Sequence, residues 1–101
     1  QFPPISIADG LRVNLGEITF NILRTFLKSE DIILVTEAEI IDATQLVFER
    51  MKIVIEPSSA TTVAAVLKDE RFKGKKVCCI ISGGNVNTAP LFDSMRESIK
   101  K

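Results

Sequence analysis

Residues 77–85 read VCCIISGGN, a run of five apolar residues followed by a serine, two glycines and an asparagine. A short, continuously apolar run that ends at glycines is typical of a strand, so Val77–Ile81 is predicted to be a strand buried on both faces. In open α/β sheets, ligands bind beyond the carboxyl ends of the strands. Because Ser82 and Asn85 follow the run directly, the stretch indicates either a tight strand-to-helix turn or a ligand-binding loop.

Two further apolar runs have the length and composition of strands. Ile32–Val35 is continuously apolar, and Ile53–Ile55 is β-branched throughout. Helical patterns surround these runs and are expected over Gly16–Leu27, from Thr36 onward, over Ala60–Leu67, and from Pro90 or Leu91 to about Ile99. This order predicts an α/β fold with parallel strands and helices on both faces of the sheet. So few strands make a thin sheet, and the neighbours that they need are not obvious in the chain, which we therefore interpret as a fragment.

Two of these helices carry start signals. Thr36, with Glu39 three residues later, predicts a capping box. The buried stripe of that helix is expected to comprise Ile40, Thr44, Val47, Phe48 and Met51. Ser58 or Ser59 is predicted to cap the next helix, whose small residues would let it lie close to a sheet or a ligand.

The first residues predict an extended segment. Pro3 and Pro4 favour an extended backbone that leads through Ile5–Ala8 to the turn signal Asp9-Gly10. The chain lacks an initiator methionine and the charged and apolar regions of a signal peptide, so we expect that it was processed or is a piece of something longer, and we expect a cytoplasmic location.

Composition excludes several classes of function. Thirteen basic and thirteen acidic residues balance, which gives no reason to expect nucleic acid binding, and no apolar stretch approaches the roughly 20 residues that cross a bilayer. Histidine is absent, so proton transfer near neutral pH must come from a perturbed lysine or carboxylate, from a cofactor, or from residues outside the chain. Cys78 and Cys79 are expected to be buried free thiols, and no pattern indicates a disulfide framework or a metal site.

Two more groups of residues lie where chemistry could occur. Glu56 follows the β-branched run and precedes a helix, where backbone amides favour negative charge. It is either a helix-start carboxylate or a site residue. Arg50 and Lys52, just upstream, form either a polar cluster or the exposed end of a helix. Asp9-Gly10 on its own indicates only a turn.

Six short motifs occur in a fixed order along the chain: Ser6–Gly10, Leu15–Phe20, Asp31-Ile32 with Val35–Glu37, Glu49–Lys52, Ile55–Ala60 and Ile81–Val86. Together they resemble the C-terminal stretch of the serine racemases and threonine/serine dehydratases, which are fold type II pyridoxal-phosphate enzymes. The resemblance covers nearly the whole chain. It implies that residues 1–101 are the incomplete C-terminal part of the cofactor-binding catalytic domain, within a three-layer large domain built on a parallel sheet.

The resemblance also implies roles for individual residues. The cofactor-binding residues that it implies are Ser82, Gly10, Asp9, Glu56 and Gly83. Ser82 would hydrogen-bond the pyridine nitrogen, Gly10 would line the cofactor with its backbone, and Glu56 would lie close to the ring. A hydroxyl does not hold a proton on the nitrogen as a carboxylate would, so the ring is a poorer electron sink and loss of a β-hydroxyl competes well with reprotonation.

A second set of implied residues concerns regulation. In serine racemases, the residues that match Lys52 and Asn85 help bind a nucleotide at the subunit interface, and the Arg50 position joins the polar network that links this site to catalysis. The resemblance implies pyridoxal phosphate as cofactor, with magnesium and ATP as effectors of a homodimeric full-length enzyme.

The parts of the family's machinery that have no counterpart here are equally informative. The Schiff-base lysine, the phosphate-binding loop and the serine that reprotonates the substrate lie N-terminal to the matched part, so no catalytic residue is assigned. We expect the parent protein to racemise or dehydrate serine or threonine, and this chain to be inactive alone. The alternatives are a truncated non-catalytic paralogue that binds a nucleotide or pairs with a full-length subunit, and a freestanding α/β domain with an unrelated anion site.

Overall fold

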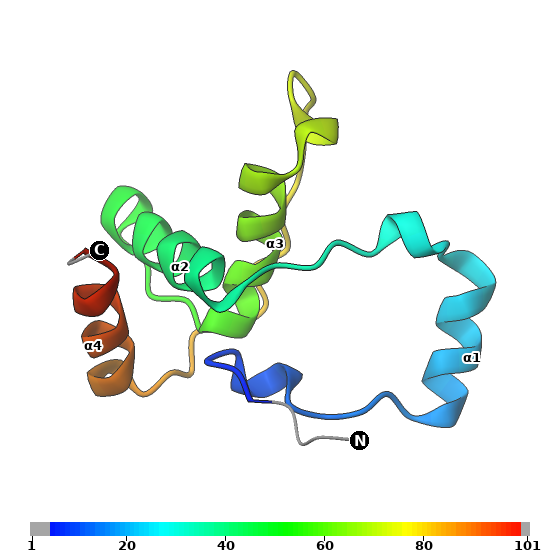
Figure 1. Ribbon diagram of the computed structural model, residues 1–101, viewed down its shortest axis with the longest axis horizontal. Coiled ribbons are helices and arrows are strands. Elements are labelled where there is room, and N and C mark those ends of the chain that lie inside the picture. The colour runs from blue at the N-terminus through cyan, green and yellow to red at the C-terminus, as the bar shows by residue number, and fades with distance from the viewer. Residues whose placement is uncertain (1–4, 100–101) are drawn as a thin grey trace.

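The computed structural model describes residues 5–99, so the expected backbone of Pro3 and Pro4 lies outside the described residues. Within this range the chain forms four α-helices and three short 3-10 helices (Figure 1). In chain order they are η1 (Asp9–Leu11), α1 (Glu17–Phe26), η2 (Ser29–Asp31), α2 (Glu37–Met51), α3 (Pro57–Lys68), η3 (Glu70–Phe72) and α4 (Thr88–Ile99). None of these helices is long and apolar enough to cross a membrane.

The three predicted strands do not form within residues 5–99. Ile32–Val35, Ile53–Ile55 and Val77–Ile81 run as extended segments without a paired neighbour. A strand becomes stable only when an adjacent strand satisfies its backbone N–H and C=O groups and covers its side chains. Leu34 and Ile80 show the consequence, because 80% and 74% of their surfaces are exposed. The predicted sheet is therefore not shown by residues 5–99 themselves, in which these three segments lack strand partners.

The burial of the two cysteines also differs from the prediction. Cys78 and Cys79 are both free thiols, but Cys78 is exposed and Cys79 is only half-buried. Both were expected to be buried in a strand, but α3 covers this segment only on the side of Cys79, whose thiol lies 3.8 Å from the Thr62 carbonyl.

The start of α2 confirms the capping-box prediction. The Thr36 hydroxyl accepts a hydrogen bond from the Glu39 N–H at 3.2 Å, and the Glu39 carboxylate accepts one from the Thr36 N–H at 2.8 Å. The bond from the Thr36 backbone, helped by Lys68 at 3.3 Å, lowers the pKa of Glu39 below its ordinary value. Both ends of this helix are thus set locally, since Lys52, the C-cap residue that follows Met51, adopts the left-handed region with φ 61°.

The start of α3 differs from the prediction. The helix begins at Pro57, and Glu56 rather than a serine occupies the N-cap position. Proline suits the first helical position because its missing N–H would have no partner there and its φ is already helical. Ser58 and Ser59 consequently lie inside the first turn, with hydroxyls free to bind other segments.

The core lies where α2 crosses α3. The buried residues that pack together are Ala43, Val47, Ile55, Ala60 and Ala64. Of the predicted stripe on α2, Ile40, Thr44 and Val47 are buried, whereas Phe48 and Met51 are exposed. The contact between the helices includes Ala43 on α2 and Ala60 and Ala64 on α3, and these small side chains allow a close approach.

Helix α4 packs on the other side of α2 and begins at Thr88, two residues before the earliest predicted position. Leu91 and Met95 are its buried residues. The Ser98 hydroxyl donates to the Asp42 carboxylate at 2.6 Å and ties the end of α4 to α2.

Helix α1 forms close to its predicted bounds but contains no buried residue. Figure 1 shows it apart from the group formed by α2, α3 and α4, at the end of two extended connections. Its apolar face is open, as Ile18 and Phe26 are each 78% exposed. The local pattern was sufficient to predict the helix, while its apolar face has no partner in the described part of the chain.

Candidate functional site

Two loops meet at the first turn of α3. The Ser58 hydroxyl accepts a hydrogen bond from the Gly10 N–H at 3.0 Å, across 48 residues of sequence. The Ser59 hydroxyl accepts one from the Ser82 N–H at 2.8 Å, across 23 residues. Consecutive side chains of a helix point in different directions, so the two serines hold two different segments. The turn at Gly10 and the loop at Ser82, predicted separately, thus lie at one end of one helix.

Glu56 and Gly83 join this site through the backbone. The Glu56 N–H donates to the Gly83 carbonyl at 3.0 Å. A Cβ added at Gly83 would lie 2.5 Å from Oε1 of Glu56, so the carboxylate rests against the glycine. The absence of a side chain at Gly83 makes room for the end of the Glu56 side chain, and a left-handed backbone plays no part, because among the described glycines only Gly74 has a positive φ.

Gly84 brings the same loop against the segment that precedes α3. A Cβ at Gly84 would lie 2.7 Å from the carbonyl oxygen of Val54, a backbone atom that cannot rotate away. The loop after residue 81 and the segment before α3 therefore run in contact. The sequence indicates a tight turn or a ligand-binding loop here, and in the structure Gly83 and Gly84 pack against other parts of the protein.

Helix α2 holds the segment before Asp9. Both oxygens of the Glu37 carboxylate accept hydrogen bonds, one from the Ser6 hydroxyl and one from the Ile7 N–H at 2.8 Å. Ala8 is fully buried next to them. Sequence reasoning placed Glu37 within a motif but gave it no task. The signal that could have predicted this role is the position of Glu37 as the first residue of α2. Because Glu39 completes the capping box, the Glu37 carboxylate is available to accept hydrogen bonds from another segment.

A cavity of about 190 Å³ opens between η1, the start of α3 and the segment that leads into α4. Its charged lining residues are Asp9 and Arg12, and the Arg12 Nε donates to the Ser6 carbonyl at 2.7 Å. The full lining is Ile7, Asp9, Arg12, Pro57, Val86, Asn87, Pro90 and Leu91. Asp9 is therefore the one predicted site residue that lines this cavity among the described residues.

The residues predicted to bind a nucleotide are all exposed: Arg50, Lys52 and Asn85. No hydrogen bond joins them within residues 5–99. They nevertheless come from adjoining segments, because Gly84, next to Asn85, touches Val54, two residues after Lys52. The segments that contain Lys52 and Asn85 thus adjoin, and Arg50 lies in the last turn of α2.

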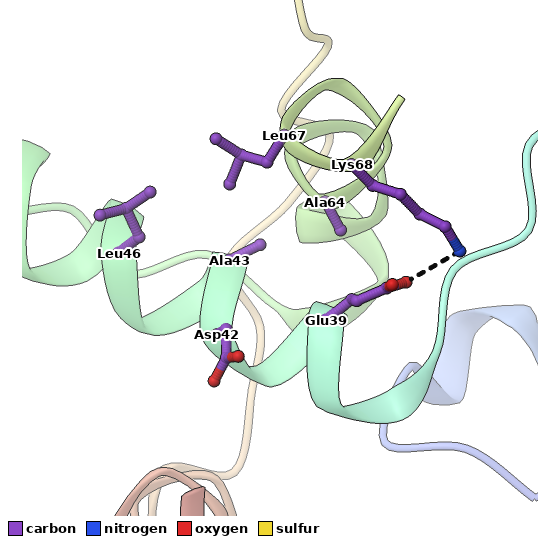
Figure 2. Close-up of a pocket in the computed structure, with 7 residues that line it drawn as sticks. All are labelled: Glu39, Asp42, Ala43, Leu46, Ala64, Leu67 and Lys68. Carbon is purple, nitrogen blue, oxygen red and sulfur yellow. Dashed lines mark hydrogen bonds and ion pairs between the residues drawn. The ribbon is translucent and has the colours of Figure 1, made fainter. Parts of the chain in front are cut away.

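A larger cavity of about 440 Å³ lies between α2 and α3 (Figure 2). Ala43, Leu46, Ala64 and Leu67 make its walls apolar, and the Glu39–Lys68 ion pair closes one side. It contains none of the predicted site residues. Leu67 and Lys68 lie at the end of α3 opposite Ser58, about 15 Å away at the rise of an α-helix. We therefore place the candidate site at the first turn of α3, where polar groups from several segments converge.

Comparison with known proteins relates this geometry to a family. The family described as pyridoxal-phosphate dependent enzyme matches residues 3–83. The serine racemase of Dictyostelium discoideum is 54% identical over 92 residues, which are 87% of this chain and 28% of that protein. The beta-hydroxyaspartate dehydratase of Paracoccus denitrificans is 41% identical over 85 residues, covering 83% of this chain and 26% of that protein.

A solved structure agrees with the sequence matches. The crystal structure of the threonine deaminase of T.th. has a TM-score of 0.77 and 39% sequence identity, covering 86% of this chain and 31% of that one. The chain thus spans less than a third of the length of each of these relatives.

Proposed function

Since this chain belongs to the family of pyridoxal-phosphate dependent enzymes, we propose that it supplies the C-terminal part of the large catalytic domain of a serine racemase or a serine/threonine dehydratase. The complete enzyme would racemise the amino acid, or dehydrate it to a keto acid and ammonia. Residues 1–101 would be inactive alone, with the Schiff-base lysine supplied by the remainder of the enzyme.

One observation carries the proposal. Ser82 and Gly10, which the family resemblance assigns to the cofactor, are both hydrogen-bonded through their backbones to the first turn of α3. Two segments that are remote in sequence are thus fixed beside each other, as the two sides of a binding site must be.

The residues present fit the cofactor. The Ser82 side chain is exposed, and within residues 5–99 its hydroxyl has no hydrogen-bond partner, so it is free to bind a ring nitrogen. Gly10 offers backbone without a side chain, and Glu56 and Gly83 lie against each other next to Ser82. We propose Ser82, Gly10, Asp9, Glu56 and Gly83 as the cofactor-binding residues of this chain.

The reaction class follows from the group that binds the pyridine nitrogen of the cofactor. When bound, pyridoxal phosphate withdraws electrons from the α-carbon of the amino acid. The task of Ser82 is to bind the pyridine nitrogen with a neutral hydroxyl, which does not hold a proton there. With a neutral partner the ring is a weaker electron sink, so loss of the β-hydroxyl would compete with reprotonation of the α-carbon. Serine and threonine are the proposed substrates, in line with the names of the serine racemase and threonine deaminase relatives.

The experiment that tests the proposal uses the complete open reading frame that contains this chain. The purified protein should bind pyridoxal phosphate, with the visible absorbance of the bound cofactor, and should convert L-serine to D-serine or to pyruvate and ammonia. A colourless, folded protein without either activity would support the non-catalytic paralogue instead. A homodimer in the cytoplasm, with magnesium as an effector, is the proposed state of the full enzyme.

Nucleotide regulation is a separate part of the proposal. Lys52 and Asn85 come from segments in contact, and Lys52 has an exposed ammonium group that suits a phosphate. Replacing Lys52 by alanine in the full enzyme should weaken activation by ATP about tenfold, the effect of losing one charged hydrogen bond. Activation would be measured as the ATP concentration at half-maximal rate, with Lys73→Ala on an exposed turn as the control. Unchanged activation in the Lys52 variant would remove nucleotide binding from the proposal.

A further inference from the structure

Ser59 is a buried polar residue that binds outside its own helix. Only 1% of its surface is exposed, and its hydroxyl oxygen accepts a hydrogen bond from the Ser82 N–H at 2.8 Å. Hydroxyls within helices commonly bond to a carbonyl of the same helix, as Thr61 does in donating to the Ser58 carbonyl at 2.8 Å. The buried hydroxyl of Ser59 is instead used to hold a segment 23 residues away.

We propose that Ser59 is a positioning residue for the cofactor site. It fixes the register of residues 79–82 along α3 and thereby decides where the Ser82 side chain lies. The inference rests on the proposed function, in which the Ser82 hydroxyl binds the pyridine nitrogen. Ser59 itself touches no cofactor in this proposal and acts only through Ser82.

The register of residues 79–82 needs such a device because the segment is extended. A slip of one residue in an extended chain moves each side chain by about 3.4 Å and turns it to the opposite face. Hydrogen bonds tolerate deviations of only about half an ångström before they weaken. A slipped Ser82 would therefore lose its ring partner altogether. The N–H of Ser82 itself is the group that Ser59 holds, so the anchor lies at the residue whose position matters.

Two other contacts of α3 with this segment are weaker. The Thr62 hydroxyl lies 3.3 Å from the Ile80 carbonyl and 3.2 Å from the Ser59 carbonyl, and its one proton cannot serve both fully. The Cys79 thiol donates to the Thr62 carbonyl at 3.8 Å, and thiols are weak donors. The Ser59 bond is the shortest of these contacts and is the one made to Ser82 itself, while the bond from the Glu56 N–H to the Gly83 carbonyl at 3.0 Å holds the next residue.

The neighbouring Ser58 has a different task. Its hydroxyl holds the Gly10 N–H, on the other side of the candidate site. Substitutions at Ser58 and Ser59 therefore act on different segments, and only those at Ser59 should change the position of Ser82.

The test uses the full-length protein and compares Ser59→Ala with Thr61→Val, whose lost hydroxyl bonds only within α3. Ser59→Ala should weaken the affinity for pyridoxal phosphate about fivefold, which is about 1 kcal/mol at 1.4 kcal/mol per tenfold. Thr61→Val should change it by less than about twofold. In a Ser82→Ala background, adding Ser59→Ala should have no further effect, because Ser59 acts through Ser82.

A second readout does not depend on the cofactor. Without pyridoxal phosphate, amide hydrogen exchange of the peptide that contains Ser82 should be about fivefold faster in Ser59→Ala than in the wild type. Unchanged exchange in Ser59→Ala would contradict the role of the Ser59 hydroxyl in holding the Ser82 N–H. Faster exchange with an unchanged affinity for pyridoxal phosphate would contradict the proposal that Ser59 positions Ser82 for the cofactor. The same would follow if Ser59→Ala lowered this affinity equally in the wild-type and Ser82→Ala backgrounds. Failure of the proposed function is seen separately, because the wild-type protein would then bind no pyridoxal phosphate.

Discussion

Replacing Gly84 by alanine is expected to lower the free energy of unfolding by about 2–4 kcal/mol. The added Cβ would lie 2.7 Å from the Val54 carbonyl oxygen, so the two segments must separate. Overpacking of this kind costs about 1–3 kcal/mol, and separation also strains the bond from the Glu56 N–H to the Gly83 carbonyl, worth about 1 kcal/mol. Urea denaturation of the variant and the wild type measures the difference.

Two matched substitutions test the steric origin of this loss. Gly16→Ala places its Cβ 3.9 Å from the nearest atom, the Thr19 hydroxyl oxygen, and should cost less than about 1 kcal/mol. Gly83→Ala meets only the end of the Glu56 side chain, which can rotate, and should fall between the two. Equal losses for Gly84→Ala and Gly16→Ala would contradict the close contact at Val54.

Replacing Ser82 by aspartate in the full enzyme should lower the ratio of elimination to racemisation about tenfold or more. A carboxylate facing the pyridine nitrogen holds a proton there, and a charged hydrogen bond is worth about 1.5–3 kcal/mol, or at least about tenfold in a rate ratio. A stronger electron sink stabilises the charge at the α-carbon and leaves more time for reprotonation. Pyruvate and D-serine formed from L-serine give the ratio, and the absorbance of the bound cofactor should shift as well.

The backbone contact makes this substitution selective. Ser59 binds the N–H of Ser82, which aspartate retains, so the loop should keep its position while only the side chain changes. Ser82→Thr keeps the hydroxyl and is the matched control, with a ratio expected within about twofold of the wild type. If the aspartate variant keeps both the ratio and the absorbance, Ser82 does not face the ring.

Local sequence was sufficient for the helices. The box formed by Thr36 and Glu39 was predicted from two residues and is present with both of its hydrogen bonds. Helix α1 was predicted from its apolar spacing and forms within one residue of its expected bounds. Capping and periodicity involve residues within one or two turns of each other, so the sequence determines them without knowledge of the remaining chain.

The candidate site was predictable only as separate pieces. The order of the motifs indicated the family, and the family comparisons support it. The pattern did not show that Ser58 and Ser59 serve as anchors for Gly10 and Ser82 instead of helix caps. These contacts span 48 and 23 residues, and no local rule relates residues that far apart.

What the sequence determined by itself was therefore the helices, the capping box at the start of α2 and the family to which the chain belongs. Tertiary structure decided the rest. Val77–Ile81 has the composition of a strand, yet it stays unpaired because a sheet exists only when neighbouring strands are present to bond its backbone. Gly84 was predicted to belong to a tight turn or a ligand-binding loop, and only the approach of Val54 shows that its missing side chain makes room for another segment. Pairing and close packing depend on residues distant in the chain, and for that reason a local pattern could not predict them.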